Sequence, residues 1–117
     1  MAGNARVVCE SAALRDGGPG VRFWVQRDGA KLPAFAIRYG GRVYAYINRC
    51  AHVGVELDWQ EAQFFDRSGL YLICSMHGAL YAPDTGRCLG GPCNGIGLEP
   101  LAVEELKGKI VCLEIRE

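Results

Sequence analysis

The sequence predicts an all-β fold, a small antiparallel β sandwich or barrel. Glycine is abundant, with 16 among 117 residues, and turn signals recur about every 8–12 residues between short β-prone segments, as in sandwiches and barrels. Helical periodicity is weak, and we expect no more than about one helical turn at each of 10–14 and 55–63. These observations favour paired strands over packed helices.

Several segments are expected to be strands because each is rich in β-branched or aromatic residues and is bounded by turn residues. They are 6–9, 21–26, 34–39, 43–48, 70–74, 101–105 and 109–115. Gly40 and Gly41 join two of these runs, and their free φ suits a two-residue hairpin turn. The stretch "LAVEELKGKIVCLEI" predicts a second hairpin, since apolar and charged residues alternate along its final strand.

Length and charge indicate one domain over residues 1–117 with no nucleic-acid or membrane surface. Thirteen basic residues balance thirteen acidic ones, and like charges are scattered rather than gathered into a stripe. No segment approaches the roughly 18 apolar residues of a spanning helix. The first residues do not read as a secretory signal, so we expect a cytoplasmic protein.

Two mixed cysteine–histidine pairs are the candidate metal ligands. "CAHVGVEL" contains Cys50 and His52, "CSMHGALY" contains Cys74 and His77, and together the pairs use both histidines of the chain. A lone histidine or cysteine is usually a packed residue, but two such pairs, each followed by glycine at an expected strand end, favour a metal site. Six cysteines could instead form disulfides, which a cytoplasmic location disfavours. Two sulfur and two nitrogen donors suit either zinc or an iron–sulfur centre.

The spacing Cys-x-His followed by Cys-x-x-His resembles that of the Rieske proteins, in which two histidines replace two cysteines on one iron of a [2Fe–2S] cluster. "CSMHGALYAPDTGRCLGGP" is similar to the second cluster loop of that family. The resemblance implies that Cys50 and Cys74 bind the inner iron and that His52 and His77 bind the outer one. It also implies a Rieske-type sandwich with a two-loop cluster-binding subdomain, its loops lying at about 48–56 and 74–93.

Departures from the family pattern indicate a Rieske-type ferredoxin. Val55 and Met76 stand where respiratory Rieske proteins carry a disulfide, and no membrane anchor is recognisable. A ring-hydroxylating oxygenase needs further histidines for its mononuclear iron, and none remains. The expected function is therefore one-electron transfer from a flavin-containing reductase to a terminal oxygenase or similar enzyme, without catalysis by this chain. An accessory subunit or redox sensor, or a structural zinc domain, stays as an alternative.

The remaining notable residues are expected to tune or support this site. Ala79 stands where high-potential members carry a hydrogen-bonding serine, whereas Tyr81 is retained, so we expect a potential in the lower half of the Rieske range. The residues about "DWQEAQFFDRSG" should form an excursion before the second ligand strand. Packing roles are expected for Trp24, Trp59 and Phe64–Phe65. Buried thiols are expected at Cys9 and Cys112. Free thiols are expected at Cys88 and Cys93 because of the compartment, with a local disulfide or a redox role as the alternative.

Overall fold

The computed structural model describes residues 6–27, 29–49, 57–58, 62–74, 78–91 and 96–113. Within these residues the chain forms short strands and a single 3₁₀ turn, η2 (Ser11–Ala13). The strands are β1 (Arg6–Glu10), β2 (Val21–Arg27), β3 (Ala30–Tyr39), β4 (Arg42–Ile47), β5 (Leu72–Ile73), β6 (Leu80–Tyr81), β7 (Cys88–Gly90), β8 (Pro100–Leu101), β9 (Val103–Leu106) and β10 (Lys109–Cys112). The predicted all-β class is confirmed.

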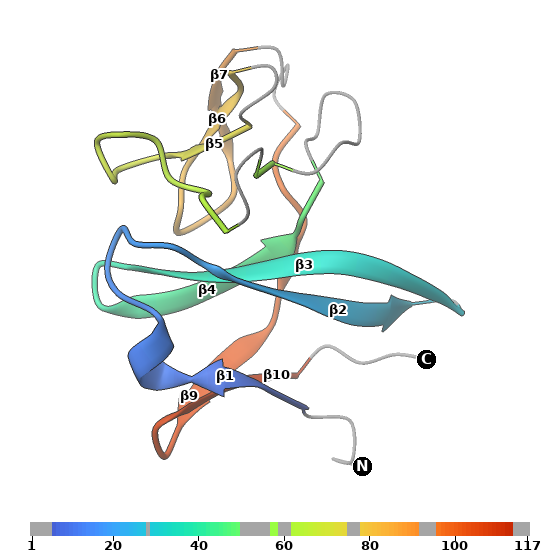
Figure 1. The fold of residues 1–117 in the computed structure, drawn as a ribbon. Coiled ribbons are helices and arrows are strands. Elements are labelled where there is room, and N and C mark those ends of the chain that lie inside the picture. Colours follow the sequence, from blue (N-terminus) through green and yellow to red (C-terminus); the bar gives the residue numbers. More distant parts are fainter. Residues whose placement is uncertain are drawn as a thin grey trace.

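The strands form three antiparallel sheets arranged one above another. Their orders are β2-β3-β4-β8, β1-β10-β9 and β5-β6-β7, and every strand pairing within them is antiparallel. The β2-β3-β4 sheet lies in the middle, between the β1-β10-β9 sheet and the small β5-β6-β7 sheet (Figure 1). No helix in the described part of the chain is long and apolar enough to cross a membrane.

Both predicted hairpins are present. β3 and β4 pair up to Tyr39 opposite Arg42, and Gly40 and Gly41 have φ of 61° and 82°, the positive values that a tight hairpin turn of this kind requires. β9 and β10 pair up to Leu106 opposite Lys109, with the turn made by the two residues between them.

The middle sheet is covered on both faces. Alternate residues of a strand point to opposite sides, so each face of the sheet contributes to a different core. On β3, Ala34 and Ala36 enter a core shared with β10 and β8, while Phe35 and Ile37 enter a second core shared with the β5-β6-β7 side. A strand covered on both faces has no polar alternation, which explains the continuous apolar run 34–37. We call the core that contains Ala34 and Ala36 the lower core, and the core that contains Phe35 and Ile37 the upper core.

The structure corrects several predicted strand boundaries. The strand predicted over 70–74 is reduced to β5, because residues 66–69 form a turn in which Asp66 accepts hydrogen bonds from the backbone N–H and the hydroxyl of Ser68 (3.1 and 2.6 Å). The strand predicted over 101–105 divides at Ala102: Leu101 pairs with β4 and Val103 with β10. The chain thus changes sheets within one apolar run.

Other differences concern elements too short to recognise or residues beyond those described. β6 and β7 were not expected, since a strand of two or three residues shows no periodicity. The helical turn expected near 10–14 is present as η2. The turn expected over 55–63 lies largely outside the described residues, as do residues 114 and 115 of the last predicted strand.

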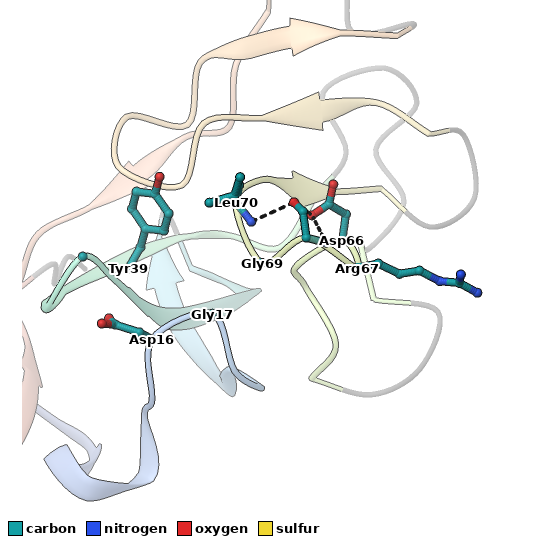
Figure 2. Close-up of a pocket in the computed structure, with 9 residues that line it drawn as sticks. Asp16, Gly17, Tyr39, Asp66, Arg67, Gly69 and Leu70 are labelled. Carbon is teal, nitrogen blue, oxygen red and sulfur yellow. Dashed lines mark hydrogen bonds between the residues drawn. The ribbon is translucent and has the colours of Figure 1, made fainter.

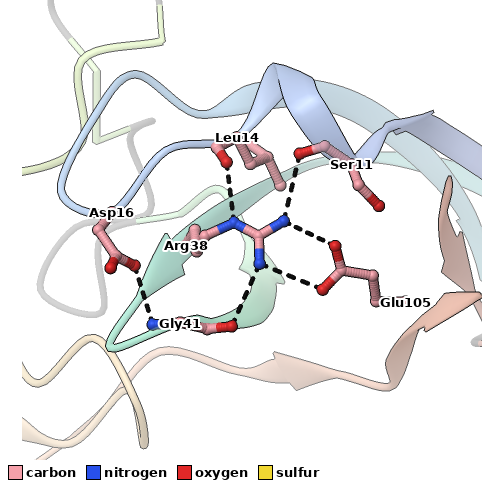
Figure 3. Close-up of polar contacts among 6 residues, drawn as sticks. All are labelled: Ser11, Leu14, Asp16, Arg38, Gly41 and Glu105. Atoms are coloured by element: carbon pink, nitrogen blue, oxygen red, sulfur yellow. Dashed lines mark hydrogen bonds and ion pairs between the residues drawn. The ribbon is translucent and has the colours of Figure 1, made fainter. Parts of the chain in front are cut away.

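The side chain of Arg38 joins three segments that are distant in sequence (Figure 3). Its Nε donates to the Leu14 carbonyl (2.8 Å) and its Nη2 to the Ser11 carbonyl (3.2 Å). The guanidinium also forms a two-pronged ion pair with Glu105 of β9, at 3.1 and 2.8 Å. This pair holds the pKa of Glu105 at about 2, well below its ordinary value of 4.5. Arg38 therefore ties the middle sheet to the sheet below it.

Because the pKa of Glu105 is lowered by folding, the stability from this ion pair is present above about pH 4.5 and is lost as the pH falls towards 2. We expect Glu105→Gln to lower the urea midpoint of unfolding at pH 7. Between about pH 4.5 and 2, the midpoint of this variant should fall less than that of the wild type. Urea unfolding at several pH values measures this. The neighbouring exposed residue provides the control, Glu104→Gln, and equal pH profiles for the two variants would contradict the assignment.

Candidate metal centre

The second predicted ligand loop starts at Cys74, directly after β5. The Cys74 side chain is fully buried, and its backbone N–H donates to the Ala79 carbonyl (2.9 Å) while its carbonyl accepts from the Gly78 N–H (2.8 Å). Gly78 has φ of 75°, which a residue with a side chain rarely adopts. The chain is thus closed between positions 74 and 79, and the loop that carries the predicted ligand His77 begins and ends at one place.

The glycine-rich stretch after β7 packs directly on this loop. A Cβ atom at Gly91 would lie 2.9 Å from both the Ala79 Cα and the Gly78 carbonyl oxygen, so only glycine permits this approach. On the other side of residues 92–95 the chain is held as closely, because a Cβ at Gly97 would lie 2.5 Å from the Gly86 carbonyl oxygen. Gly91 therefore packs on the end of the second ligand loop, and Gly97 packs on the turn between β6 and β7.

The first predicted ligand loop is anchored at its two ends. It follows β4, where the Asn48 N–H donates to the Pro33 carbonyl (2.8 Å) and the Arg49 N–H to the Ile47 carbonyl (2.9 Å). At the far end of the loop, the Leu57 N–H donates to the buried Oδ1 of Asn48 (2.8 Å). Residues 48 and 57 thus lie in contact although nine positions separate them in the sequence.

One core supports both loops. Leu57, at the end of the first loop, shares the upper core with Cys74, Ala79 and Tyr81 of the second loop. The described residues at the ends of the two loops therefore lie on one core, as a site built from both loops requires. Of the predicted ligands, Cys74 is described, whereas Cys50, His52 and His77 lie outside the described residues. A buried thiol in the core that the described ends of both loops share fits a sulfur-ligated cluster held in a protected site.

Two residues expected to tune the centre are buried beside Cys74. Ala79 and Tyr81 are both fully buried, and Tyr81 lies opposite Leu72 of β5 and Cys88 of β7 in the small sheet. Ala79 has no hydroxyl group, so the donor that a serine would supply is missing at this position. The tuning roles of both residues stay predictions.

The other cysteines only partly follow expectation. Cys9 and Cys112 are thiols, with Cys112 buried and Cys9 half-buried; burial raises the pKa of the Cys9 thiol. The free thiol expected at Cys88 is wrong, because Cys88 is disulfide-bonded. The expected compartment disfavours disulfides in general, whereas a particular disulfide also depends on how close the fold brings its two cysteines. Cys93 lies outside the described residues.

Phe64 and Phe65 have the packing roles expected of them, whereas Trp24 is 48% exposed. Phe64 is fully buried and Phe65 is packed against the same core. Trp24 lies on the β2–β3 hairpin, where the Lys31 ammonium is 5.4 Å from the centre of its ring. Trp59 lies outside the described residues.

A surface hollow of about 460 Å³ lies away from the two loops, between residues 16–17, the β3–β4 turn and residues 66–70 (Figure 2). Its carboxylates have structural partners: Asp16 accepts from the Gly41 N–H (2.9 Å) and Asp66 accepts from Ser68. The hollow forms where the excursion before β5 rests on the loop before β2, since Gly69 lies against Gly17. These acidic groups close turns and do not converge on a substrate.

Known structures share the fold of this chain. A chain from "Complex of reduced oxygenase and oxidized ferredoxin in carbazole 1,9a-dioxygenase" aligns with a TM-score of 0.71 and 26% identity over 97% of this chain and 95% of that one. The ferredoxin of carbazole 1,9a-dioxygenase from Nocardioides aromaticivorans IC177 aligns with a TM-score of 0.69 and 25% identity over 93% and 96%. The terminal oxygenase from Novosphingobium sp. KA1 aligns with a TM-score of 0.74 and 25% identity, over 97% of this chain but 30% of its own.

Sequence comparison defines the class. The model of the Rieske [2Fe-2S] domain matches residues 4–107, and no curated protein sequence matches the chain. The chain belongs to the Rieske [2Fe–2S] domain family, and its cofactor is a [2Fe–2S] cluster of the Rieske type. Its fold is that of the Rieske-type ferredoxins of dioxygenase systems.

Proposed function

We propose that this protein is a one-electron carrier that accepts an electron from a flavin-containing reductase and delivers it to a terminal oxygenase. The observation that carries the proposal is the nearly complete mutual coverage with a dioxygenase ferredoxin, 93% of this chain and 96% of that one. The terminal oxygenase shares only this domain with the chain, over 30% of its length. The proposed role is transfer without catalysis by this chain, and we place it in the cytoplasm, where thiolate ligands stay reduced.

We propose Cys50 and Cys74 as ligands of the inner iron and His52 and His77 as ligands of the outer iron. The burial of Cys74 and the shared core beneath both loops support this assignment. When bound, the cluster supplies a one-electron couple, and two neutral imidazoles in place of two thiolates make its charge less negative, which favours reduction. The chain's own contribution is to exclude water from the thiolate side of the cluster and to hold the two ligand loops at a fixed distance from each other.

The proposal is tested on purified protein and then with partners. Protein produced with iron should be red-brown, contain two irons and two labile sulfides per chain, and give a rhombic EPR signal when reduced. A reductase and a terminal oxygenase should then turn over only when this protein is added. Zinc without sulfide would instead indicate a structural zinc domain, and a cluster that supports no oxygenase would indicate an accessory subunit or redox sensor.

Removal of the Tyr81 hydroxyl is expected to lower the reduction potential. Rieske potentials span about −150 to +300 mV and rise with hydrogen bonds to the cluster sulfurs. With Ala79 unable to donate, we expect a potential in the lower half of this range, to which Tyr81 contributes some tens of millivolts. Protein-film voltammetry of wild type and Tyr81→Phe measures the shift.

A matched change separates the hydroxyl from a general effect on packing. Tyr46 is also buried, but its hydroxyl donates to the backbone carbonyl of Pro83 (2.8 Å) and so is already bonded to a protein oxygen. Tyr46→Phe should therefore leave the potential unchanged. An unchanged potential in Tyr81→Phe, or equal shifts in both variants, would contradict the role of Tyr81.

A further inference from the structure

A buried polar pair closes the base of the first ligand loop. Asn48 is 1% exposed, and the side chain of Asp58 is equally buried. Asn48 uses both ends of its amide: Oδ1 accepts from the Leu57 N–H (2.8 Å), and Nδ2 donates to Asp58 Oδ1 (3.0 Å). The residue that precedes the loop is thus bonded to the two residues that follow it.

Asp58 extends this contact to the rest of the fold. Its Oδ2 accepts from the Ala62 N–H (2.8 Å) and lies 3.4 Å from Nε of Arg22 on β2. The Ala62 carbonyl in turn accepts from the Gly20 N–H (2.9 Å). Ala62 has φ of 70°, a conformation that costs energy for a residue with a side chain and persists only where the surroundings hold it. One carboxylate therefore anchors the loop end, the excursion and β2.

The chemistry of this pair permits a single arrangement. A buried carboxylate is tolerated only when donors surround it, and here an amide N–H₂, a backbone N–H and a guanidinium do so. Buried polar contacts add little net stability compared with apolar packing of equal volume. Their particular effect is directional, because each donor must meet its acceptor within a narrow range of distance and angle.

We propose that Asn48 and Asp58 form a clamp that positions the first ligand loop for cluster binding. Asn48 lies two residues before Cys50, so holding it against Leu57 and Asp58 sets where the loop leaves and re-enters the fold. The proposal rests on the assignment of Cys50 and His52 as ligands and adds two residues that act through them. Neither residue contacts the cluster in this account; both are positioning residues.

Exchange of the two side chains tests the clamp. In Asn48→Asp two carboxylates would meet. In Asp58→Asn the new amide N–H₂ would face another donor, either the Asn48 N–H₂ or the Ala62 N–H. In the double variant Asn48→Asp/Asp58→Asn, the new carboxylate accepts from Leu57 N–H and from the new amide, whose oxygen accepts from Ala62 N–H. The double variant thus restores the three hydrogen bonds of the clamp and the same net charge, whereas the ion pair of residue 58 with Arg22 is lost. Asp16→Asn is the matched control, since Asp16 also accepts a backbone N–H, from Gly41 (2.9 Å), away from the ligand loops.

The measurement is the rate of cluster loss from the holoprotein, followed by visible absorbance at a temperature where the far-UV CD is unchanged. Loss of a direct partner of a metal ligand costs about 10–100-fold in metal affinity. Because Asn48 and Asp58 act through the loop backbone, we expect each single variant to lose its cluster up to about 10-fold faster. The EPR spectrum of the reduced singles should broaden. The double variant should lose its cluster more slowly than either single variant and regain the wild-type spectrum, and Asp16→Asn should keep the wild-type rate and spectrum.

The outcomes separate the clamp from the proposed function. Single variants that keep the wild-type rate and spectrum, or a double variant that is unfolded or loses its cluster as fast as the singles, would overturn the clamp. If a single variant fails to fold, the double variant still decides, because recovery of its cluster supports the clamp. Wild-type protein that binds no [2Fe–2S] cluster would overturn the ligand assignment and, with it, this proposal.

Discussion

Replacement of either histidine, His52→Ala or His77→Ala, is expected to abolish the cluster. Each alanine removes one of the two proposed imidazole ligands of the outer iron and leaves a coordination position that no other histidine of this sequence can fill. Because the binding free energy of a metal centre is part of the folding free energy of its domain, the variants should also unfold at lower temperature. Iron and sulfide analysis, visible absorption and thermal unfolding measure both effects.

Variants of the cysteines proposed not to bind iron provide the controls for this experiment. Cys88→Ser and Cys93→Ser should keep two irons and two sulfides per chain, as a [2Fe–2S] cluster contains. Since Cys88 is disulfide-bonded, its variant is expected to unfold more easily while still holding the cluster. A colourless Cys88→Ser protein would show that the ligand assignment is wrong, as would a His77→Ala protein with a full cluster.

The second large effect is expected from Phe64→Ala. Phe64 is fully buried and stacks on Phe35 of β3, with ring centres 3.9 Å apart and planes within 10°. Its carbonyl also accepts from the Ile73 N–H (2.9 Å), so the residue joins the middle sheet to the strand that precedes Cys74. Truncation of a buried phenylalanine to alanine costs about 3–5 kcal/mol, a large part of the roughly 5–15 kcal/mol that stabilises a typical domain.

The neighbouring aromatic residue provides a matched control. Phe65 is only half-buried and its ring centre lies 6.3 Å from that of Tyr39, so Phe65→Ala should cost clearly less. Urea unfolding of the two variants and the wild type gives the free energies of unfolding. Because Phe64 supports the upper core shared with Cys74, its variant should also release the cluster sooner. Equal losses of stability in the two variants would contradict the central place given to Phe64.

Much of the fold followed from local features of the sequence. The Gly40-Gly41 pair predicted the β3–β4 hairpin because only a residue without a side chain readily adopts the positive φ of that turn. The strands of the middle sheet were recognised from β-prone composition between turns. β6 and β7 were missed, since their pairing depends on the closed loop from Cys74 to Ala79 and on no pattern within the strands themselves.

The candidate site divides in the same way. Paired spacing of cysteine and histidine is a local pattern, so the sequence by itself predicted a metal site. The resemblance of that spacing to the Rieske proteins added the kind of cluster, the ligand assignment and the missing serine at Ala79. Three of those ligands lie outside the described residues, and their assignment stays a prediction. What supports it from the structure is the burial of Cys74 and the upper core common to both loops.

Only the tertiary structure decided how the loops are held. Asn48 and Asp58 are ten positions apart and look like ordinary polar residues in the sequence, yet folding buries both and bonds them to each other. The change of sheet at Ala102 and the stacking of Phe64 on Phe35 were equally hidden, and the sequence left the redox state of Cys88 open. The physical reason is common to all of them: each depends on a distance between segments remote in sequence, whereas spacing and composition report only what neighbouring residues can do.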